Sequence, residues 1–233
     1  LWTAEGKEGV LRAAVFDGGI SEEMDHSPFA NAHDPDGIGA PVEGYVDHGT
    51  GVTSAVLFGP ITKGTALPRP YGVVDHYRVL DEKSSNEPYE LYDALKRIQD
   101  VLQSRKYSFI NLSIGPSMAI EDYEVHSWTA VLDSLLADGE SLTTIAVGND
   151  GEKDHESGNA RVQVPSDSVN SLAIGAATSM SKKWRRAPYS CIGPGRSPGL
   201  IKPEVVAFGG SSAEPFYILD QSLTIATPDA GTS

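Results

Sequence analysis

The chain has 233 residues, of which 39% are hydrophobic and 21% are charged, so it can bury a sizeable core without disulfides. Its net charge of −14 argues against nucleic acid or an anionic membrane as a partner, because both require a basic surface. No apolar run reaches the ~20 residues that span a bilayer, and the first residues lack the pattern of a signal peptide.

Short apolar runs alternate with longer amphipathic segments along the chain, which is typical of parallel βαβ construction. The runs are rich in β-branched residues and are bounded by Gly, Asp or Asn. The predicted strands are 11–17, 73–80, 107–115, 142–148 and 171–177. The predicted helices are 48–59, 88–106 and 124–139, the last with Gly139 as its C-terminal cap. The sequence therefore predicts an α/β fold with a mostly parallel central sheet.

Two other features of the sequence favour ordinary structural roles. The single cysteine, Cys191, excludes an internal disulfide and is expected to pack as a small apolar residue. The basic cluster at 181–188 is expected to form a solvated loop anchored by Trp184, with a local docking patch as the alternative.

Four polar residues stand where chemistry is expected in a parallel sheet. Asp17 ends the first predicted strand, His48 opens a predicted helix, Asn149 directly follows a strand, and Ser233 ends the chain. Ligands and substrates of open parallel sheets bind at the carboxyl ends of the strands. We therefore expect these four side chains to lie close together.

Taken singly, each of these residues has an ordinary explanation, such as a turn former for Asp17 or a surface histidine for His48. Together they supply the parts of a nucleophilic site. A serine hydroxyl needs a base to remove its proton, and the base needs a buried carboxylate to fix its tautomer. An oxyanion that forms on a substrate carbonyl needs donors already aimed at it, which an Asn side chain can provide.

The segments around these residues resemble the subtilisin-like serine proteases (subtilases, peptidase family S8), in which the order is Asp, His, Ser. The matching segments are "AAVFDGGI", "DHGTGVTSAVLFG", "INLSIG", "IAVGNDG", "GLIKPEVVAFGG" and "AGTS". The resemblance implies a subtilisin-like three-layer α/β fold with helices on both faces of the sheet. It further implies that residues 1–233 form a subtilase catalytic domain that lacks its C-terminal helices.

The family resemblance assigns a role to each residue of the constellation. Ser233 is implied as the nucleophile, His48 as the general base and then acid, and Asp17 as the orienting carboxylate. The side chain of Asn149 and the backbone N–H of Ser233 are implied to hold the oxyanion. The predicted activity is that of a serine endopeptidase that works through an acyl-enzyme intermediate.

The resemblance also implies a substrate-binding surface. An extended peptide is expected to pair with the strand edge 113–115, and small pocket residues are expected to leave room for a large apolar side chain. Asp150, beside this pocket, suggests a secondary tolerance for basic side chains. The implied substrate-binding residues are Ser113, Ile114, Gly115, Ala146, Gly148 and Asp150.

The expected partner is a peptide or protein substrate, with no nucleic acid and no membrane. No cofactor is expected to be required, but structural calcium is common in this family. Asp34 and Asp36 are candidate calcium ligands, with a solvated acidic loop as the alternative interpretation of this segment. Flanking domains of a larger parent chain are expected, and a cytoplasmic and a secreted location both remain open.

Two other function classes are alternatives to the protease. A nucleotide-binding domain is disfavoured because "FDGGISEE" contains neither phosphate-binding glycine pattern. A non-catalytic subtilase-like binding or regulatory module stays open, as does a fragment that is inactive as supplied, since misplacement of a nucleophile by ~1 Å can cost ~10² in rate.

Overall fold

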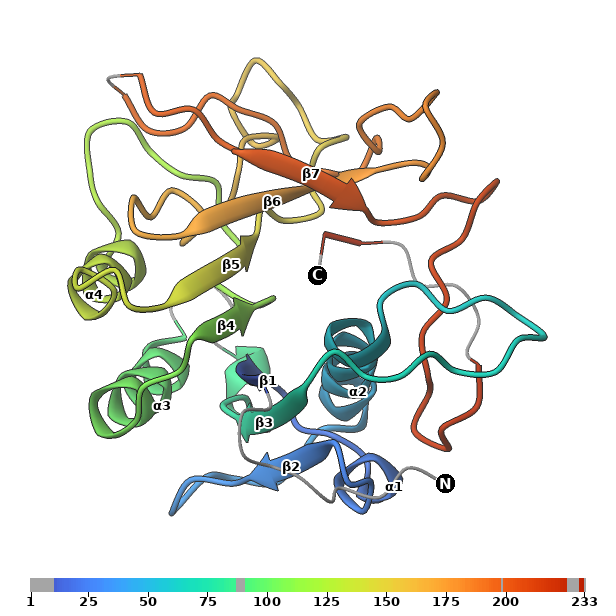
Figure 1. Cartoon of the computed structure of the whole chain (residues 1–233). Helices are drawn as coiled ribbons and strands as arrows, with labels where there is room; N and C mark the ends of the chain where they lie inside the picture. Colours follow the sequence, from blue (N-terminus) through green and yellow to red (C-terminus); the bar gives the residue numbers. More distant parts are fainter. Residues whose placement is uncertain (1–10, 87–90, 198, 226–230, 233) are drawn as a thin grey trace.

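Seven parallel strands form one continuous sheet in this computed structural model, which describes residues 11–86, 91–197, 199–225 and 231–232. The strands lie in the order β2-β3-β1-β4-β5-β6-β7 (Figure 1). Their bounds are β1 Arg12–Asp17, β2 Ala30–His33, β3 Val73–Arg78, β4 Phe109–Leu112, β5 Leu142–Ala146, β6 Leu172–Ala177 and β7 Val205–Phe208. The predicted α/β fold with a parallel sheet is confirmed.

Helices cover both faces of the sheet, so the domain has three layers. α3 and α4 lie side by side against one face, and α2 lies against the other (Figure 1). The helix bounds are α1 Glu22–Asp25, α2 Glu43–Phe58, α3 Tyr92–Ser104 and α4 Ser127–Leu135, with a short 3-10 turn at Ser84–Asn86. No helix within these described ranges combines the length and the apolar character that crossing a bilayer requires.

The alternating side chains of β1 feed two hydrophobic clusters, one on each face. Phe16 packs with Ile98 of α3 and Trp128 of α4, whereas Val15 packs with Val52 and Leu57 of α2. Because β1 lies between two strands and under helices on both sides, its end is held rigidly. That end carries Asp17.

The structure corrects two predicted helix boundaries. α2 begins at Glu43, not at His48, so His48 lies within the helix instead of opening it. Gly44 and Val46 are weak helix formers, and for this reason the segment gave no helical signal. α4 ends at Leu135, and Gly139 adopts its left-handed conformation (φ 69°) beyond the helix cap at Leu136.

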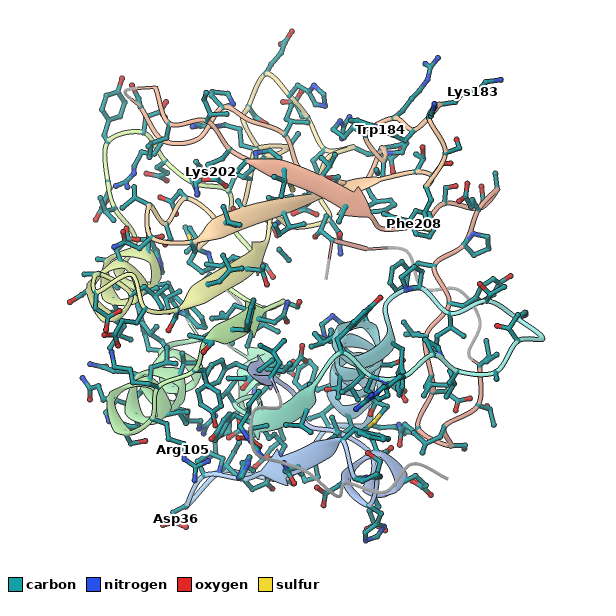
Figure 2. The ribbon with its side chains drawn as sticks, in the orientation of Figure 1. Asp36, Arg105, Lys183, Trp184, Lys202 and Phe208 are labelled. Carbon is teal, nitrogen blue, oxygen red and sulfur yellow. The ribbon has the colours of Figure 1, made fainter. Side chains whose placement is uncertain are left out.

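The basic loop also differs from its prediction. Trp184 is 51% exposed and does not anchor the loop. The loop is held instead by two hydrogen bonds, in which the Thr178 N–H donates to the Arg185 carbonyl and the Arg185 N–H donates to the Thr178 hydroxyl. The Arg186 guanidinium also donates to backbone carbonyls, including that of Pro188. Figure 2 shows Lys183 pointing away from the body of the molecule. Cys191 is fully buried, as expected.

Candidate active site

A cleft of about 570 Å³ runs along the carboxyl ends of β1, β4 and β5. Every predicted site residue within the described ranges lines it. These residues are Asp17, His48, Ser113, Ile114, Gly115, Ala146, Gly148, Asn149 and Asp150. Ser233 lies outside the described residues, but its neighbour Thr232 also lines the cleft.

Asp17 and His48 form a hydrogen-bonded pair at one side of the cleft. Nδ1 of His48 lies 2.9 Å from Oδ1 of Asp17, and the same oxygen accepts the backbone N–H of Gly18 at 2.7 Å. The Asp17 side chain is buried, whereas the His48 side chain is 34% exposed and faces the cleft. A carboxylate can only accept, so Nδ1 of His48 carries the proton and Nε2 is the basic nitrogen.

Asn149 lies at the other side of the cleft and is tied to the segment that leads to Ser233. Its Oδ1 accepts from the backbone N–H of Thr232 at 3.0 Å and from the Thr232 hydroxyl at 3.1 Å. The Thr232 hydroxyl in turn accepts from the backbone N–H of Gly148 at 3.2 Å. Because its oxygen is engaged in this way, the orientation of the Asn149 amide is fixed and its NH₂ group remains the donor of that side chain.

Gln163 occupies the pocket that the sequence analysis left open for a large side chain. Gly148 has a φ of 96°, and a Cβ at this position would overlap the Gln163 carboxamide. Opposite, Gly115 packs against the backbone of Val164. The pocket between the 113–115 and 146–148 segments is therefore shortened by a polar side chain. Sequence reasoning missed Gln163, since nothing in "RVQVPSD" marks it as a cleft residue.

Asp150 already has two partners. Its Oδ2 accepts from Gln163 Nε2 at 2.5 Å and lies 2.8 Å from Nζ of Lys153. A basic substrate side chain would have to share or displace these partners. Lys153 would therefore compete with a basic substrate residue for the Asp150 carboxylate. Lys153 is another cleft residue that sequence reasoning missed.

Part of the cleft lining is apolar. Tyr45 of α2, Leu80 after β3 and Leu91 before α3 form it. Leu91 lies within the predicted helix 88–106, but it instead forms the N-cap of α3 in the left-handed conformation (φ 47°). These three residues come from segments distant in sequence, so their meeting in one wall could not be predicted from a motif.

The proposed calcium ligands do not fit a cation site. Asp34 receives two hydrogen bonds from the Arg78 guanidinium, at 3.0 and 2.6 Å, which already supplies its positive partner. Asp36 is exposed and projects at the edge of the molecule (Figure 2). Among the residues that the structure describes, no group of three or more His, Cys, Asp or Glu side chains is arranged to hold a metal ion.

Comparison with known proteins identifies the family of the chain. The model of the Subtilase family matches residues 12–233, so the chain belongs to this family of serine peptidases. A search of curated proteins found no match.

Several solved structures share the fold. The chain is similar to the self-cleaved protease domain of PatA, with 18% identity, a TM-score of 0.62 and coverage of 95% of this chain and 74% of that chain. It is similar to the A-subunit of the AB5 toxin from E. coli, with 18% identity, a TM-score of 0.63 and coverage of 95% and 73%. It is also similar to the PatG macrocyclase in complex with peptide, with 14% identity, a TM-score of 0.65 and coverage of 95% and 71%. At these identities the likeness establishes the fold.

Proposed function

We propose that the protein is a serine endopeptidase in which Asp17, His48 and Ser233 form the catalytic triad. The observation that carries this proposal is the 2.9 Å bond between Asp17 and His48 at the edge of a cleft. It is supported by the anchoring of Asn149 to Thr232, the residue directly before Ser233. The membership in the Subtilase family supports the same chemistry.

In the first half of the reaction, Oγ of Ser233 attacks the carbonyl carbon of the scissile peptide bond. Nε2 of His48 takes the hydroxyl proton, and the carboxylate of Asp17 stabilises the resulting imidazolium. The negative charge moves to the carbonyl oxygen, where the Asn149 amide and the Ser233 backbone N–H donate to it. When the C–N bond breaks, His48 gives its proton to the leaving amine and an ester to Ser233 remains.

In the second half, water attacks this ester and loses its proton to His48. The proton then passes to Oγ of Ser233 as the C–O bond breaks, which releases the carboxyl product and restores the serine. Each half of the reaction returns His48 and Asp17 to their starting protonation, so the proposed scheme requires no cofactor.

The substrate is proposed to be an extended peptide that lies along residues 113–115 and pairs with their backbone. The side chain before the scissile bond would enter the pocket beside Gly148, where Gln163 limits its length. A short side chain, or one that can hydrogen-bond to a carboxamide, is therefore favoured over a large apolar one. This revises the large apolar residue expected from the sequence.

Labelling with a fluorophosphonate tests the proposal, because this reagent modifies only an activated serine. The protein should be labelled, and the Ser233→Ala and His48→Ala variants should not be. Ser222→Ala serves as a matched control, since Ser222 lies on the exposed turn at Asp220. A folded protein that is not labelled would instead support the non-catalytic module.

A further inference from the structure

His76 is a fully buried histidine in the middle of β3 that the catalytic scheme above does not use. Its neighbours in the run 73–80 include Val74 and Tyr77, both buried. A buried imidazole is costly unless both ring nitrogens are satisfied. Its partners therefore indicate what the residue does.

Both nitrogens of the His76 ring are hydrogen-bonded. Nε2 lies 3.1 Å from the backbone nitrogen of Gly19, and Nδ1 lies 2.9 Å from Oγ1 of Thr53. A backbone N–H can only donate, so Nε2 is the acceptor. In the neutral ring the proton is then on Nδ1, which donates to the Thr53 hydroxyl.

The two partners belong to the segments that carry the catalytic pair. Gly19 follows Asp17 in the loop after β1, and Thr53 follows His48 in α2. The contact is close, since a Cβ on Gly49 would overlap the carbonyl oxygen of Gly19 and would lie 2.9 Å from Cε1 of His76. The His76 ring on β3 is therefore hydrogen-bonded both to the loop that follows Asp17 and to the helix that carries His48.

We propose that His76 is a positioning residue that sets the distance between Asp17 and His48 by holding the loop after Asp17 and the helix of His48 to β3. The proposal rests on the proposed function, in which these two side chains act together. A ring held at both nitrogens by rigid elements restricts the approach of the pair, and this is the kind of support a preorganised site needs.

The electrostatic surroundings keep the ring in the required state. Burial lowers the pKa of His76 to about 4, against the opposing influence of the Asp17 charge. His48, Asp34 and His33 exert smaller effects on the same ring. At neutral pH the ring is therefore uncharged, and Nε2 remains available to accept from Gly19.

Two variants of His76 separate positioning from simple filling of space. His76→Leu fills the space with an apolar side chain but removes both hydrogen bonds. His76→Gln offers a hydrogen-bond acceptor and a donor on one carboxamide. Thr129→Val is the matched control, because it removes a buried hydrogen bond of 2.6 Å to Asp167, outside the residues that line the catalytic cleft.

The readouts are kcat and KM on a peptide substrate and the NMR signal of the His48 Nδ1–H proton. His76→Leu should lower kcat by about 10- to 100-fold with little change in KM, as expected for a shift of the pair by a fraction of an ångström. His76→Gln should recover most of this loss, and Thr129→Val should leave kcat unchanged. The proton signal should persist in the parent and in His76→Gln and be lost in His76→Leu.

The NMR arm separates the failure of this inference from the failure of the proposed function. If the parent is not labelled by the fluorophosphonate, the protease proposal fails, but the His48 proton still reports whether His76 holds the pair. An unchanged kcat and an unchanged proton signal in His76→Leu would overturn the inference, as would an equal loss of kcat in Thr129→Val. If His76→Leu does not fold, Thr53→Val removes one of the two bonds and should give a smaller loss of the same kind.

Discussion

The two sides of the cleft are built in different ways. On the Asp17–His48 side, β1, β3 and α2 are packed together, and their polar contacts are buried beneath the site. On the Asn149 side, a loop after β5 is joined to Thr232 by three hydrogen bonds of 3.0 to 3.2 Å. The first side is positioned by the core of the domain, and the second by a few bonds between two loops.

This difference suggests that the base side depends on core packing and on buried polar contacts beneath it, whereas the oxyanion side depends on a few hydrogen bonds between loops. Core packing resists small shifts because displaced side chains lose many contacts at once. The contact between the two loops consists of three hydrogen bonds, and each contributes only about 1 kcal/mol to stability, so the loss of one weakens the contact directly.

The largest expected effect is on the base side. Asp17→Asn should lower kcat by about 10⁴-fold, because an amide at this position favours the wrong tautomer of His48 and does not stabilise the imidazolium. Steady-state kinetics on a peptide substrate measures the loss. Asp47→Asn is the matched control, since Asp47 precedes His48 but is exposed and accepts from Gln221. Activity within ten-fold of the parent would contradict the assigned role.

The next effect tests the oxyanion side. Asn149→Leu should lower kcat by about 10²- to 10³-fold with little change in KM, because the lost donor acts on charge that develops in the transition state. Thr232→Val keeps the amide but removes the hydroxyl that joins Asn149 to Gly148, and its loss should be nearer ten-fold, about one hydrogen bond. If the two variants lose the same activity, the anchoring of Asn149 by Thr232 matters as much as its NH₂ donor. The loss in Thr232→Val would then exceed that of one hydrogen bond.

Acid should destabilise the folded protein through His76, which lies beneath the base side. The folded pKa of His76 is about 4, below its ordinary value of 6.5, so the unfolded chain binds a proton at higher pH than the folded one. The stability that this group contributes is present above pH 6.5 and is lost as the pH falls toward 4. Between pH 7 and 4.5 it amounts to roughly 2 kcal/mol.

The measurement is urea unfolding of the parent and of His76→Gln at several pH values in this window. The free energy of unfolding should fall less steeply with acid in the variant. Asp75 does not interfere, because its pKa is lowered: burial raises it, but hydrogen bonds from Tyr107 and Asn31 outweigh that effect. Its contribution is lost only below the ordinary Asp range. If the free energy of unfolding falls with pH equally in the two proteins, protonation of His76 is not the cause of the loss of stability in acid.

Motifs and strand periodicity predicted most of the residues that line the cleft before the structure placed them. Asp17 and Asn149 were predicted at strand ends because a buried apolar run stops at each of them, and the parallel sheet brings those ends together. β2 was missed because "ANAH" is a four-residue strand inside an acidic, Gly-rich segment. β7 was missed because it is short and partly exposed, between Pro203 and Gly209.

The contributions of His76 and Gln163 could not be predicted in this way. Each depends on partners far away in the sequence, such as Gly19 for His76 and Gly148 for Gln163. Periodicity shows that residue 76 lies in a strand but not which loop its ring reaches. Such contacts follow from tertiary packing, and a single sequence does not carry that information.

The smallest expected effect concerns substrate choice on the oxyanion side. Gln163→Ala should open the pocket beside Gly148, because the carboxamide now lies where a Cβ of Gly148 would be. The ratio of kcat/KM for a peptide with Phe before the scissile bond to one with Ala should rise by about ten-fold or more, the range expected when a pocket gains room for apolar groups.

The same substitution also removes the Gln163 bond to Asp150, which leaves Lys153 as its partner. Substrates with Arg or Lys at this position should therefore gain less than the Phe substrate, since Lys153 still competes for the carboxylate. Gln103→Ala, on the exposed face of α3, is the matched control and should leave both ratios unchanged. A Phe/Ala ratio that does not move would show that the substrate side chain enters elsewhere, such as the apolar part of the cleft lined by Tyr45 and Leu80.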